Sequence, residues 1–517
     1  MSDALNRRSF ITGAVGCAIV TVAACPSTGM QDAFASEGSK DEVEEVDTDI
    51  VVVGGGAAGL TAAIQATELG ARVTLLEKTD MLGGNARMTE GIFGLGSPLQ
   101  QEKGINIPVG DVIEEEMTYT NFRSWGPLLH KYFSASGDNI QWLLDEGVQI
   151  KEVSNYRGVS SFDCFHWWEG ERGALFLDTL AARAKEAKVD IRLLTAAEEL
   201  VFGDDGSVTG VVGYNSENDK RYRFVGKAVI LASGGFAADL KRVGQMTWID
   251  TDGVTPYGAN DGAGIRLALS AGCGTSSVCG LYKTTLAGEG IGSPTRVAAC
   301  FQPLLMVNET GVRFAREDLN ITSYSALYFN AINSQRKAFS VLDSSVIDKL
   351  ENEGIIYAFL PYKEGDKMEG LQADIDAAVA SGNPNVFHGE TLDELAAAMG
   401  VAPATFAETV ARYNEACEKG FDEDFGKGAS YLNPVVEGPF YAFLQTPAVY
   451  VTIGGIDVDI DNQVVTPEGA KIPGLFSAGV DCCKLYRETY NYQLSGGMIG
   501  YCIYSGRVAA RTACADL

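Results

Sequence analysis

Positive charge and histidine are both scarce in this sequence of 517 residues. Lysine and arginine together number 40 against 68 aspartates and glutamates, which gives a formal net charge of −28, and there are three histidines. Because a nucleic-acid site needs a concentrated basic surface, this balance argues against a nucleic-acid partner. The 11 cysteines include no CxxC pair and no CxxCH haem-attachment motif, and no residues have metal-ligand spacing, so no metal site is expected.

Long hydrophobic runs are missing from the body of the chain. No internal run reaches the roughly 20 apolar residues that a membrane helix needs, so the sequence predicts no integral membrane span. Hydrophobic residues nevertheless make up 46% of the chain, and its length is enough for two or three domains with a large core. The composition therefore predicts an acidic globular protein.

Residues 1–35 are typical of a twin-arginine export signal, because Arg7 and Arg8 precede a short apolar run. A disordered start with a chance arginine pair is the alternative. Cleavage after Ala35 and lipid attachment at Cys25 both fit the sequence, and it does not choose between them. We expect a periplasmic or otherwise extracytoplasmic protein that folds around a cofactor before export.

A dinucleotide-binding motif follows. An apolar strand leads directly into Gly-Gly-Gly-Ala-Ala-Gly and a helix of small residues. In this motif Gly54 makes the tight turn, Gly56 lets the backbone approach a pyrophosphate, and Gly59 lets the helix pack closely on the strand. A second strand ends in Glu77, 18 residues after Gly59, where an acid accepts the hydroxyls of the adenosine ribose.

Three further glycine segments favour FAD over NAD. Gly83 and Gly84 look like the second loop that flavoproteins wrap over the pyrophosphate. Ser233 and Gly234 end another apolar strand, and Gly479 follows a strand near the end of the chain that returns to the nucleotide. No second strand–GxGxxG–helix unit is visible, so a built-in NAD(P)H domain is not expected.

Together these segments resemble the superfamily of FAD enzymes that contains fumarate reductases, flavocytochromes and 3-ketosteroid dehydrogenases. The resemblance runs over most of the chain after residue 47 and includes several shorter motifs: Asn260–Gly264, Asn308–Phe314, Arg412–Asn414, Phe421–Lys427 and Val451–Gly455. It implies an α/β fold in which a discontinuous, Rossmann-like FAD-binding domain carries an inserted α+β capping domain.

The expected domain organisation follows from that resemblance. After the signal, residues 36–46 form an acidic linker. The FAD-binding domain comprises residues 47–279 and 448–517, and the capping domain with the substrate site comprises residues 280–447. The predicted cofactor-binding residues are Gly54, Gly56, Ala58, Gly59, Glu77, Lys78, Gly83, Gly84, Asn85, Ser233, Gly234, Asp261, Gly479, Leu494 and Ser495.

The sequence departs from the fumarate reductases at three positions. Ile321 falls where family members that reduce fumarate or urocanate carry their proton-donating arginine. Tyr450 replaces a histidine, and the final substrate arginine is replaced around Gln493. A dicarboxylate brings two negative charges that need cationic partners, so losing these groups together argues against fumarate.

Three tyrosines lie in seven residues just before the last glycine pair. Ketosteroid dehydrogenases hold a substrate ketone with a tyrosine hydroxyl and the N–H of a glycine four residues later, and Tyr492 and Gly496 have that spacing. Such a pair of donors stabilises an enolate as an oxyanion hole does. The alternative is that Tyr492 only packs on the flavin. Tyr486 and Tyr490 are expected to form wall or core.

With Ile321 inert, the proton that the reaction needs has to come from another group. A phenol is a plausible donor once a cation or a water chain lowers its pKa, and a displaced arginine is the other option. The candidates on the segments expected to face the flavin are Tyr324, Tyr282 and Tyr450, and the candidate arginines nearby in sequence are Arg316 and Arg487.

The predicted function is reduction of an activated C=C conjugated to a carbonyl in a bulky, apolar, steroid-like or phenylpropanoid-like substrate. Reduced FAD is expected to give hydride to the beta carbon. Electrons should come from an external cytochrome or quinol-linked donor, which makes the substrate an anaerobic respiratory acceptor. The alternatives are a ketosteroid-type dehydrogenase running oxidatively, a fumarate-, urocanate- or cinnamate-type reductase, and an electron-transfer flavoprotein without a substrate site.

Overall fold

The computed structural model describes residues 43–517 except for a few short segments. The segments outside the described part are 157–159, 171, 248, 252–253, 285–290, 292–293, 321–324, 358–361, 488–489 and 516. The predicted export signal and Tyr324 therefore lie outside the described residues. Among the described residues, no helix has both the length and the apolar character to cross a membrane.

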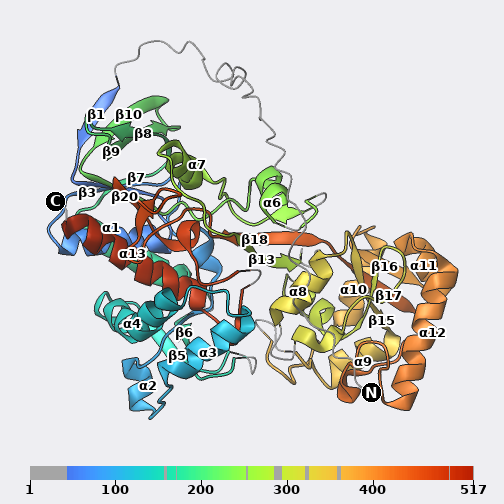
Figure 1. The fold of residues 1–517 in the computed structure, drawn as a ribbon. Coiled ribbons are helices and arrows are strands. Elements are labelled where there is room, and N and C mark those ends of the chain that lie inside the picture. Colours follow the sequence, from blue (N-terminus) through green and yellow to red (C-terminus); the bar gives the residue numbers. More distant parts are fainter. Residues whose placement is uncertain are drawn as a thin grey trace, which may run out of the picture. The chain divides into compact units, whose positions relative to one another are not determined.

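A six-stranded sheet forms the centre of the nucleotide-binding part (Figure 1). Its strands, in spatial order, are β19 (Gln463–Val465), β20 (Lys471–Ser477), β11 (Ala228–Leu231), β2 (Ile50–Val53), β3 (Val73–Leu76) and β7 (Asp190–Arg192). β11 pairs in parallel with both β2 and β20, so the two ends of the chain meet in one sheet. All four residues of β2 are buried, as expected for a parallel strand covered on both faces. The predicted discontinuous Rossmann-like domain is confirmed.

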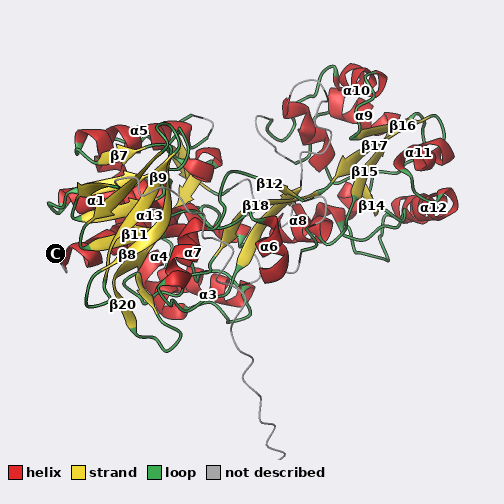
Figure 2. Ribbon diagram, turned by 90° about the horizontal axis from the view of Figure 1, so that it is seen from above, coloured by secondary structure: helices red, strands yellow, loops and turns green. Residues whose placement is uncertain are grey.

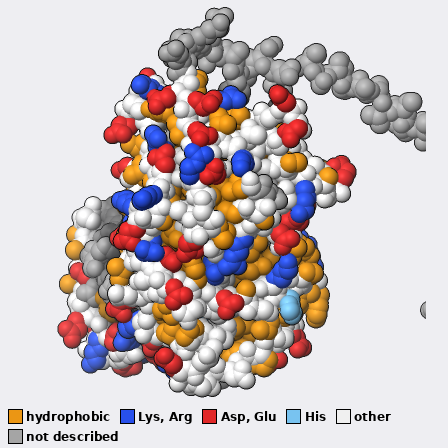
Figure 3. Space-filling view, turned by 90° about the vertical axis from the view of Figure 1, so that its left-hand side faces the viewer, with side chains coloured by type: hydrophobic (Ala, Val, Ile, Leu, Met, Phe, Trp, Pro, Cys, Tyr) orange, Lys and Arg blue, Asp and Glu red, His pale blue; other side chains and the backbone are white. Residues whose placement is uncertain are grey.

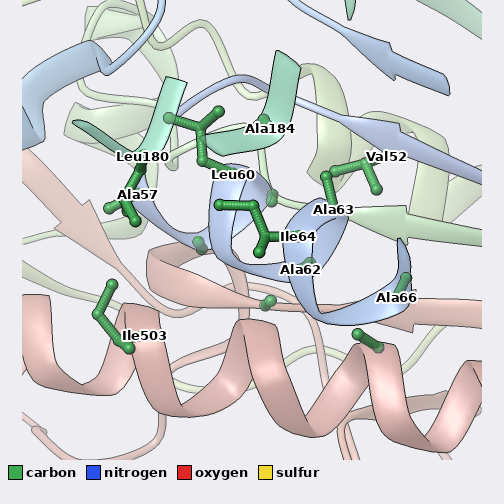
Figure 4. Close-up of a cluster of buried hydrophobic side chains, with 14 of the residues drawn as sticks. Val52, Ala57, Leu60, Ala62, Ala63, Ile64, Ala66, Leu180, Ala184 and Ile503 are labelled. Carbon is green, nitrogen blue, oxygen red and sulfur yellow. The ribbon is translucent and has the colours of Figure 1, made fainter. Parts of the chain in front are cut away.

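Helices α1 (Ala57–Glu68), α5 (Ala174–Glu186) and α13 (Gly497–Ala515) cover one face of this sheet. Figure 4 shows α1 between the strands and α13, with Val52, Ile64 and Ile503 in one apolar cluster. A Cβ on Gly506 of α13 would lie 2.5 Å from the carbonyl oxygen of Ala58, so the two helices approach closely only because small residues face each other.

The opposite face of the main sheet packs against a four-stranded sheet. Its order is β1 (Glu44–Asp47), β10 (Lys220–Val225), β9 (Val208–Asn215) and β8 (Thr195–Phe202). β1 begins inside the predicted acidic linker, because Glu44–Asp47 pair in parallel with β10 and place Val46 opposite Phe224. The boundary of the linker at residue 46 stays a prediction.

The remaining elements before residue 280 support the site region. A small sheet has the order β4 (Gly91–Phe93), β6 (Phe165–Trp168) and β5 (Ile150–Ser154). The helices are α2 (Pro98–Glu102), α3 (Val109–Tyr119), α4 (Gly126–Asp145), α6 (Leu240–Met246) and α7 (Ala263–Ser270). Acidic and basic side chains are interspersed with hydrophobic ones on the face of the molecule in Figure 3.

Most of the predicted capping segment forms a separate α+β arrangement (Figure 2). Its antiparallel sheet has the order β14 (Leu305–Asn308), β15 (Ala338–Asp343), β17 (Phe440–Gln445) and β16 (Val386–Gly389). The helices of this segment are α8 (Ser325–Asn333), α9 (Ser344–Asn352), α10 (Leu371–Ala380), α11 (Leu392–Met399) and α12 (Pro403–Lys419). Two apolar clusters of its own, one around Phe443 and one around Phe406, fill its core.

A second three-stranded sheet contains the strand by which the chain enters the capping segment and the strand by which it leaves. Its order is β12 (Thr255–Pro256), β18 (Pro447–Ile453) and β13 (Cys279–Thr284). β13 and β18 pair in antiparallel register from Cys279 opposite Ile453 to Thr284 opposite Pro447. The predicted boundaries at residues 280 and 447 therefore fall within two strands that hydrogen-bond to each other, and the exact limits of the two domains stay a prediction.

Candidate active site

The first glycine loop has the geometry that a dinucleotide-binding turn needs. Gly54 has φ of +106°, in the left-handed region that favours glycine. A Cβ on Gly59 would lie 1.8 Å from the Gly54 carbonyl oxygen, so helix and loop pack in direct contact. A Cβ on Gly56 would meet no atom closer than 4.0 Å. The space beside Gly56 is thus open, as it must be if a phosphate group is to occupy it.

The start of α1 is suited to an anion. No side chain caps it at Gly56, and its first turn holds no acidic residue. The orphan N–H groups and the helix dipole at such an end bind phosphate. Together with the open space beside Gly56, this uncapped helix end shows that the residues present fit the pyrophosphate of FAD.

Glu77 lies beside the glycine loop, as predicted. Its Oε2 accepts a hydrogen bond of 2.9 Å from Gly55 N, and its Oε1 accepts bonds of 2.8 and 2.9 Å from the N and Oγ1 of Thr79. Oε2 accepts only one of these bonds and therefore keeps lone-pair capacity for a ribose hydroxyl. The carboxylate is therefore oriented by the backbone before any ligand arrives.

The second glycine loop joins the first. Gly83 N donates to Gly55 O at 2.8 Å, and both Gly83 and Gly84 have positive φ. Asn85 instead forms two hydrogen bonds with Tyr450. Its side-chain Nδ2 donates to the backbone carbonyl oxygen of Tyr450 at 2.7 Å, and its backbone carbonyl oxygen accepts from Tyr450 Oη at 2.8 Å. Asn85 therefore ties the cofactor loop to β18.

Lys78 and Asp261, both predicted to bind the cofactor, are brought together. Lys78 Nζ lies 3.0 Å from Asp261 Oδ2. Burial acts to raise the pKa of Asp261, but the hydrogen bond and charge of Lys78, with the charge of Arg266, lower it overall. The pair connects the end of β3 to the start of α7, and its binding of cofactor stays a prediction.

Asp481 is a buried acid that the sequence reasoning missed. Its carboxylate accepts the backbone N–H groups of Ser233 and Gly235, both at 2.6 Å, and the hydroxyl of Ser233. Burial raises the pKa of Asp481, although these hydrogen bonds oppose the shift. Asp481 thus fixes the Ser233–Gly234–Gly235 turn, and its position two residues after the predicted Gly479 was the available signal.

Of the predicted C-terminal cofactor-binding residues, Leu494 and Ser495 directly precede α13, and Gly479 lies beside the middle of α13, where its N–H donates to Ser505 Oγ. Gly479 has φ of +73°, and a Cβ there would lie 2.9 Å from the Ala58 Cβ on α1. Leu494 and Ser495 are buried, and Ser495 Oγ donates to the Tyr492 carbonyl oxygen at 2.5 Å. The structure brings Gly479 to the start of α1, where Ala58 lies.

Of the two predicted donors to the substrate oxygen, the Tyr492 hydroxyl and the Gly496 N–H, only the first is without a hydrogen-bond partner among the described residues. Tyr492 is partly buried, and its hydroxyl makes no hydrogen bond to any described residue. The Gly496 N–H, in contrast, donates to Tyr490 Oη at 2.8 Å. Tyr490, expected to be wall or core, therefore occupies the donor that sequence reasoning assigned to the substrate.

Aromatic side chains surround Tyr492. Its ring lies 4.9 Å from that of Tyr490 in a T-shaped contact and 6.5 Å from that of Phe329. Burial raises the pKa of Tyr492 well above its usual value, and the nearby phenols of Tyr490, Tyr357 and Tyr450 raise it further. Tyr492 is therefore a neutral hydrogen-bond donor near pH 7 in an aromatic setting.

The predicted proton donors have different surroundings in the structure. Burial raises the pKa of Tyr450 while Arg172 acts to lower it, and the Tyr450 hydroxyl is engaged with Asn85. Arg316 is paired with Asp318 at 2.6 Å, so its contacts favour a structural role over the predicted catalytic one. Tyr324 lies outside the described residues and stays a prediction.

Comparisons with known proteins agree with this geometry. The model of the FAD binding domain family matches residues 49–497. The chain is 36% identical over 481 residues to vinyl phenol reductase from Lactiplantibacillus plantarum, covering 90% of this chain and 96% of that protein.

Two solved structures share the fold. One is the open conformation of a flavocytochrome c3 fumarate reductase, with a TM-score of 0.68 and 24% identity over 91% of this chain and 78% of that chain. The other is 3-ketosteroid delta1-dehydrogenase from Sterolibacterium denitrificans, with a TM-score of 0.71 and 18% identity over 91% of this chain and all of that chain. This chain belongs to the FAD binding domain family and is an FAD-dependent oxidoreductase acting on CH–CH bonds.

Proposed function

We propose that the protein reduces a C=C bond in an uncharged, phenylpropanoid-like or steroid-like substrate in which the double bond is conjugated to an oxygen-bearing group. The observation that carries the proposal is the hydroxyl of Tyr492, which has no partner among the described residues and lies among aromatic rings. A phenol in this setting suits a flat, apolar molecule with one oxygen to be held. The 36% identity to a vinyl phenol reductase supports a phenylpropanoid-like skeleton.

The arrangement of arginines supports an uncharged substrate. Arg313 lies within 2.8 Å of both Glu317 and Asp422, Arg316 is paired with Asp318, and Arg487 donates to Ser277 Oγ at 2.6 Å. The ion pairs of Arg313 are buried and therefore costly to break. Arg316 is 38% exposed but already has an acidic partner, and Arg487 is held only by hydrogen bonds to neutral groups. Arg313 is therefore committed within the protein, and Arg316 and Arg487 are partly engaged.

The proposed chemistry assigns one task to each group. FAD, when bound, supplies the hydride. Tyr492 donates a hydrogen bond to the substrate oxygen and stabilises the negative charge that develops there as one carbon receives hydride. A proton then reaches the other carbon, and Tyr450 and Tyr324 remain the proposed donors. Tyr450 has to leave the Asn85 carbonyl to act, so its donation requires a rotation of its hydroxyl.

A second candidate function rests on Arg172. This exposed residue precedes α5, no hydrogen bond or ion pair joins it to a described residue, and its charge acts on Tyr450. A free guanidinium beside the site is what a carboxylate needs. An enoate such as a cinnamate would then be the substrate, with Arg172 in place of the missing arginines.

We further propose that the protein is exported and takes electrons from a cytochrome or a quinol-linked partner. The twin-arginine pattern at Arg7 and Arg8 and the absence of haem and NAD motifs from the sequence support this. The fold shared with a flavocytochrome fumarate reductase is compatible with such a donor. The same site running oxidatively, as a dehydrogenase, is distinguished only by experiment.

The test is anaerobic stopped-flow reoxidation of the dithionite-reduced flavoprotein. Acceptors are 4-vinylphenol, 4-phenylbutenone, a 3-keto steroid enone, cinnamate, fumarate and urocanate. We expect oxidation by the uncharged acceptors, a loss of about ten- to hundredfold in Tyr492→Phe, and little change in Arg172→Gln. Oxidation only by the acids, abolished in Arg172→Gln, would establish the enoate function instead. No oxidation by any organic acceptor would leave an electron-transfer flavoprotein.

A further inference from the structure

Glu116 is a buried acid that the proposed chemistry does not use. It lies on the inward face of α3, one turn after Val112, and its side chain is 1% exposed. Its Oε2 accepts a hydrogen bond of 3.1 Å from Asn491 Nδ2. Its Oε1 is buried, and no described residue donates a hydrogen bond to it or pairs with it as a cation.

This environment keeps Glu116 neutral. Burial raises the pKa of Glu116 to about 8, the charge of Glu115 on the same helix raises it too, and the bond from Asn491 opposes the shift. The titratable groups facing it from the C-terminal segment are Tyr486 and Tyr490, whose pKa values are also raised by burial. Glu116 is the first of these buried groups to ionise as pH rises.

Other titratable groups lie one layer further out. Tyr132 on α4 and Cys483 act on Tyr486, and Cys164 acts on Tyr490. Burial raises the pKa of Cys164 to about 12 and that of Tyr132 well above its usual value. Both groups are neutral near pH 8, and either would become an anion on ionising, so neither can offset the charge of an ionised Glu116.

Asn491 connects Glu116 to the predicted catalytic tyrosine. Asn491 is fully buried, and its Oδ1 accepts a 2.9 Å hydrogen bond from Gln493 N. That bond caps the short turn η6 (Tyr492–Leu494), whose first residue is Tyr492. A continuous chain of contacts therefore runs from the Glu116 carboxyl through the Asn491 amide to the turn that presents the Tyr492 hydroxyl.

We propose that Glu116 in its neutral form is a positioning residue for Tyr492, and that loss of its proton switches the site off. The inference rests on the proposed role of Tyr492. An ionised Glu116 would place an unpaired negative charge in a low-dielectric core, where it acts on Tyr490, whose ring contacts that of Tyr492. The reaction builds negative charge on the substrate oxygen that Tyr492 holds, and two like charges in one low-dielectric region raise each other's energy.

Three variants test the proposal. Glu116→Gln keeps the bond to Asn491 but cannot ionise, Glu116→Ala removes the bond, and Glu114→Gln changes an exposed acid on the same helix as a matched control. The turnover number is measured from pH 6 to 10 with an uncharged acceptor.

We expect wild type and Glu114→Gln to lose activity above pH about 8. Glu116→Gln should keep wild-type turnover at pH 7, within about twofold, and retain it at pH 9. Glu116→Ala should fall about ten- to hundredfold at all pH values, as a misplaced catalytic group does.

Two results would overturn the proposal: an unchanged alkaline limb in Glu116→Gln, or wild-type turnover in Glu116→Ala. If Glu116→Ala does not fold, the pH profile of Glu116→Gln decides alone.

A second measurement does not depend on turnover. The free energy of unfolding of wild type should fall relative to Glu116→Gln as pH rises towards 8, and equal pH dependence would show that Glu116 is not neutral in the fold. If Tyr492→Phe has no effect on turnover while this difference persists, the proposed function of Tyr492 fails rather than the titration of Glu116.

Discussion

The backbone N–H of Gly496 donates a 2.8 Å hydrogen bond to the hydroxyl oxygen of Tyr490. The sequence spacing assigned this N–H to a substrate oxygen, together with Tyr492. In the structure the Tyr490 hydroxyl accepts this hydrogen bond instead, and the Tyr490 ring makes a T-shaped contact with the ring of Tyr492. The two neighbouring tyrosines thus have different roles. Tyr490 is hydrogen-bonded to the backbone just before α13, and Tyr492 presents its hydroxyl to the proposed substrate site.

The two tasks predict different results for the two phenylalanine variants. Tyr490→Phe leaves the partly buried Gly496 N–H without this partner, which costs about 1–3 kcal/mol of stability. Tyr492→Phe removes a hydroxyl without a partner and should leave stability within about 0.5 kcal/mol while turnover falls. Urea unfolding and steady-state turnover of both variants check this. A Tyr490→Phe protein of unchanged stability and much lower turnover would contradict the assignment.

Two glycines of the first loop should fail in different ways. A Cβ on Gly59 would lie 1.8 Å from the Gly54 carbonyl oxygen, so Gly59→Ala should not fold stably. Gly56→Ala meets no protein atom closer than 4.0 Å, so it should fold but bind FAD weakly, because its methyl group occupies the place of a phosphate. Circular dichroism and flavin absorbance separate the two outcomes. Gly56→Ala with full flavin content would place the pyrophosphate elsewhere.

Asp481→Asn tests the buried carboxylate that the sequence reasoning missed. The change replaces one acceptor oxygen by an N–H₂ group that faces the backbone N–H of Ser233 or Gly235. We expect a loss of about 2–4 kcal/mol in stability and weaker FAD binding, since the turn at Ser233 loses its anchor. Thermal unfolding with and without added FAD measures both effects. Asp205→Asn serves as a control, because Asp205 is an exposed acid outside the predicted cofactor-binding residues that hydrogen-bonds to Ser207 in its own turn.

The pH dependence of stability carries the signature of Glu116. Its pKa is about 8 in the fold against 4.5 in the unfolded chain, so the folded state holds the proton more tightly. The free energy of unfolding therefore falls as pH rises from about 4.5 to about 8. At pH 7 holding this proton costs about 3 kcal/mol, an upper figure for a buried group. Glu116→Gln should be more stable than wild type at pH 7 by up to that amount and equal to it at pH 4. Denaturant titrations at the two pH values give the difference.

The sequence alone determined the nucleotide-binding part of this protein. A buried strand, a glycine turn, a helix of small residues and a terminal acid interact over short sequence distances, and each has one physical solution, so Gly54, Gly59 and Glu77 lie where the motif predicts. The same is true of the discontinuity, because the apolar strands at both ends of the chain need neighbours in one parallel sheet.

Only the tertiary structure decided the roles of the tyrosines and of the buried acids. Tyr490 and Tyr492 are both phenols, and their difference arises from which one meets the Gly496 N–H. The nearest sequence neighbours of Glu116 do not reveal that Asn491, 375 residues later, is its partner. Hydrogen bonds and burial set the chemistry of such groups, and both depend on segments that meet only when the chain is folded.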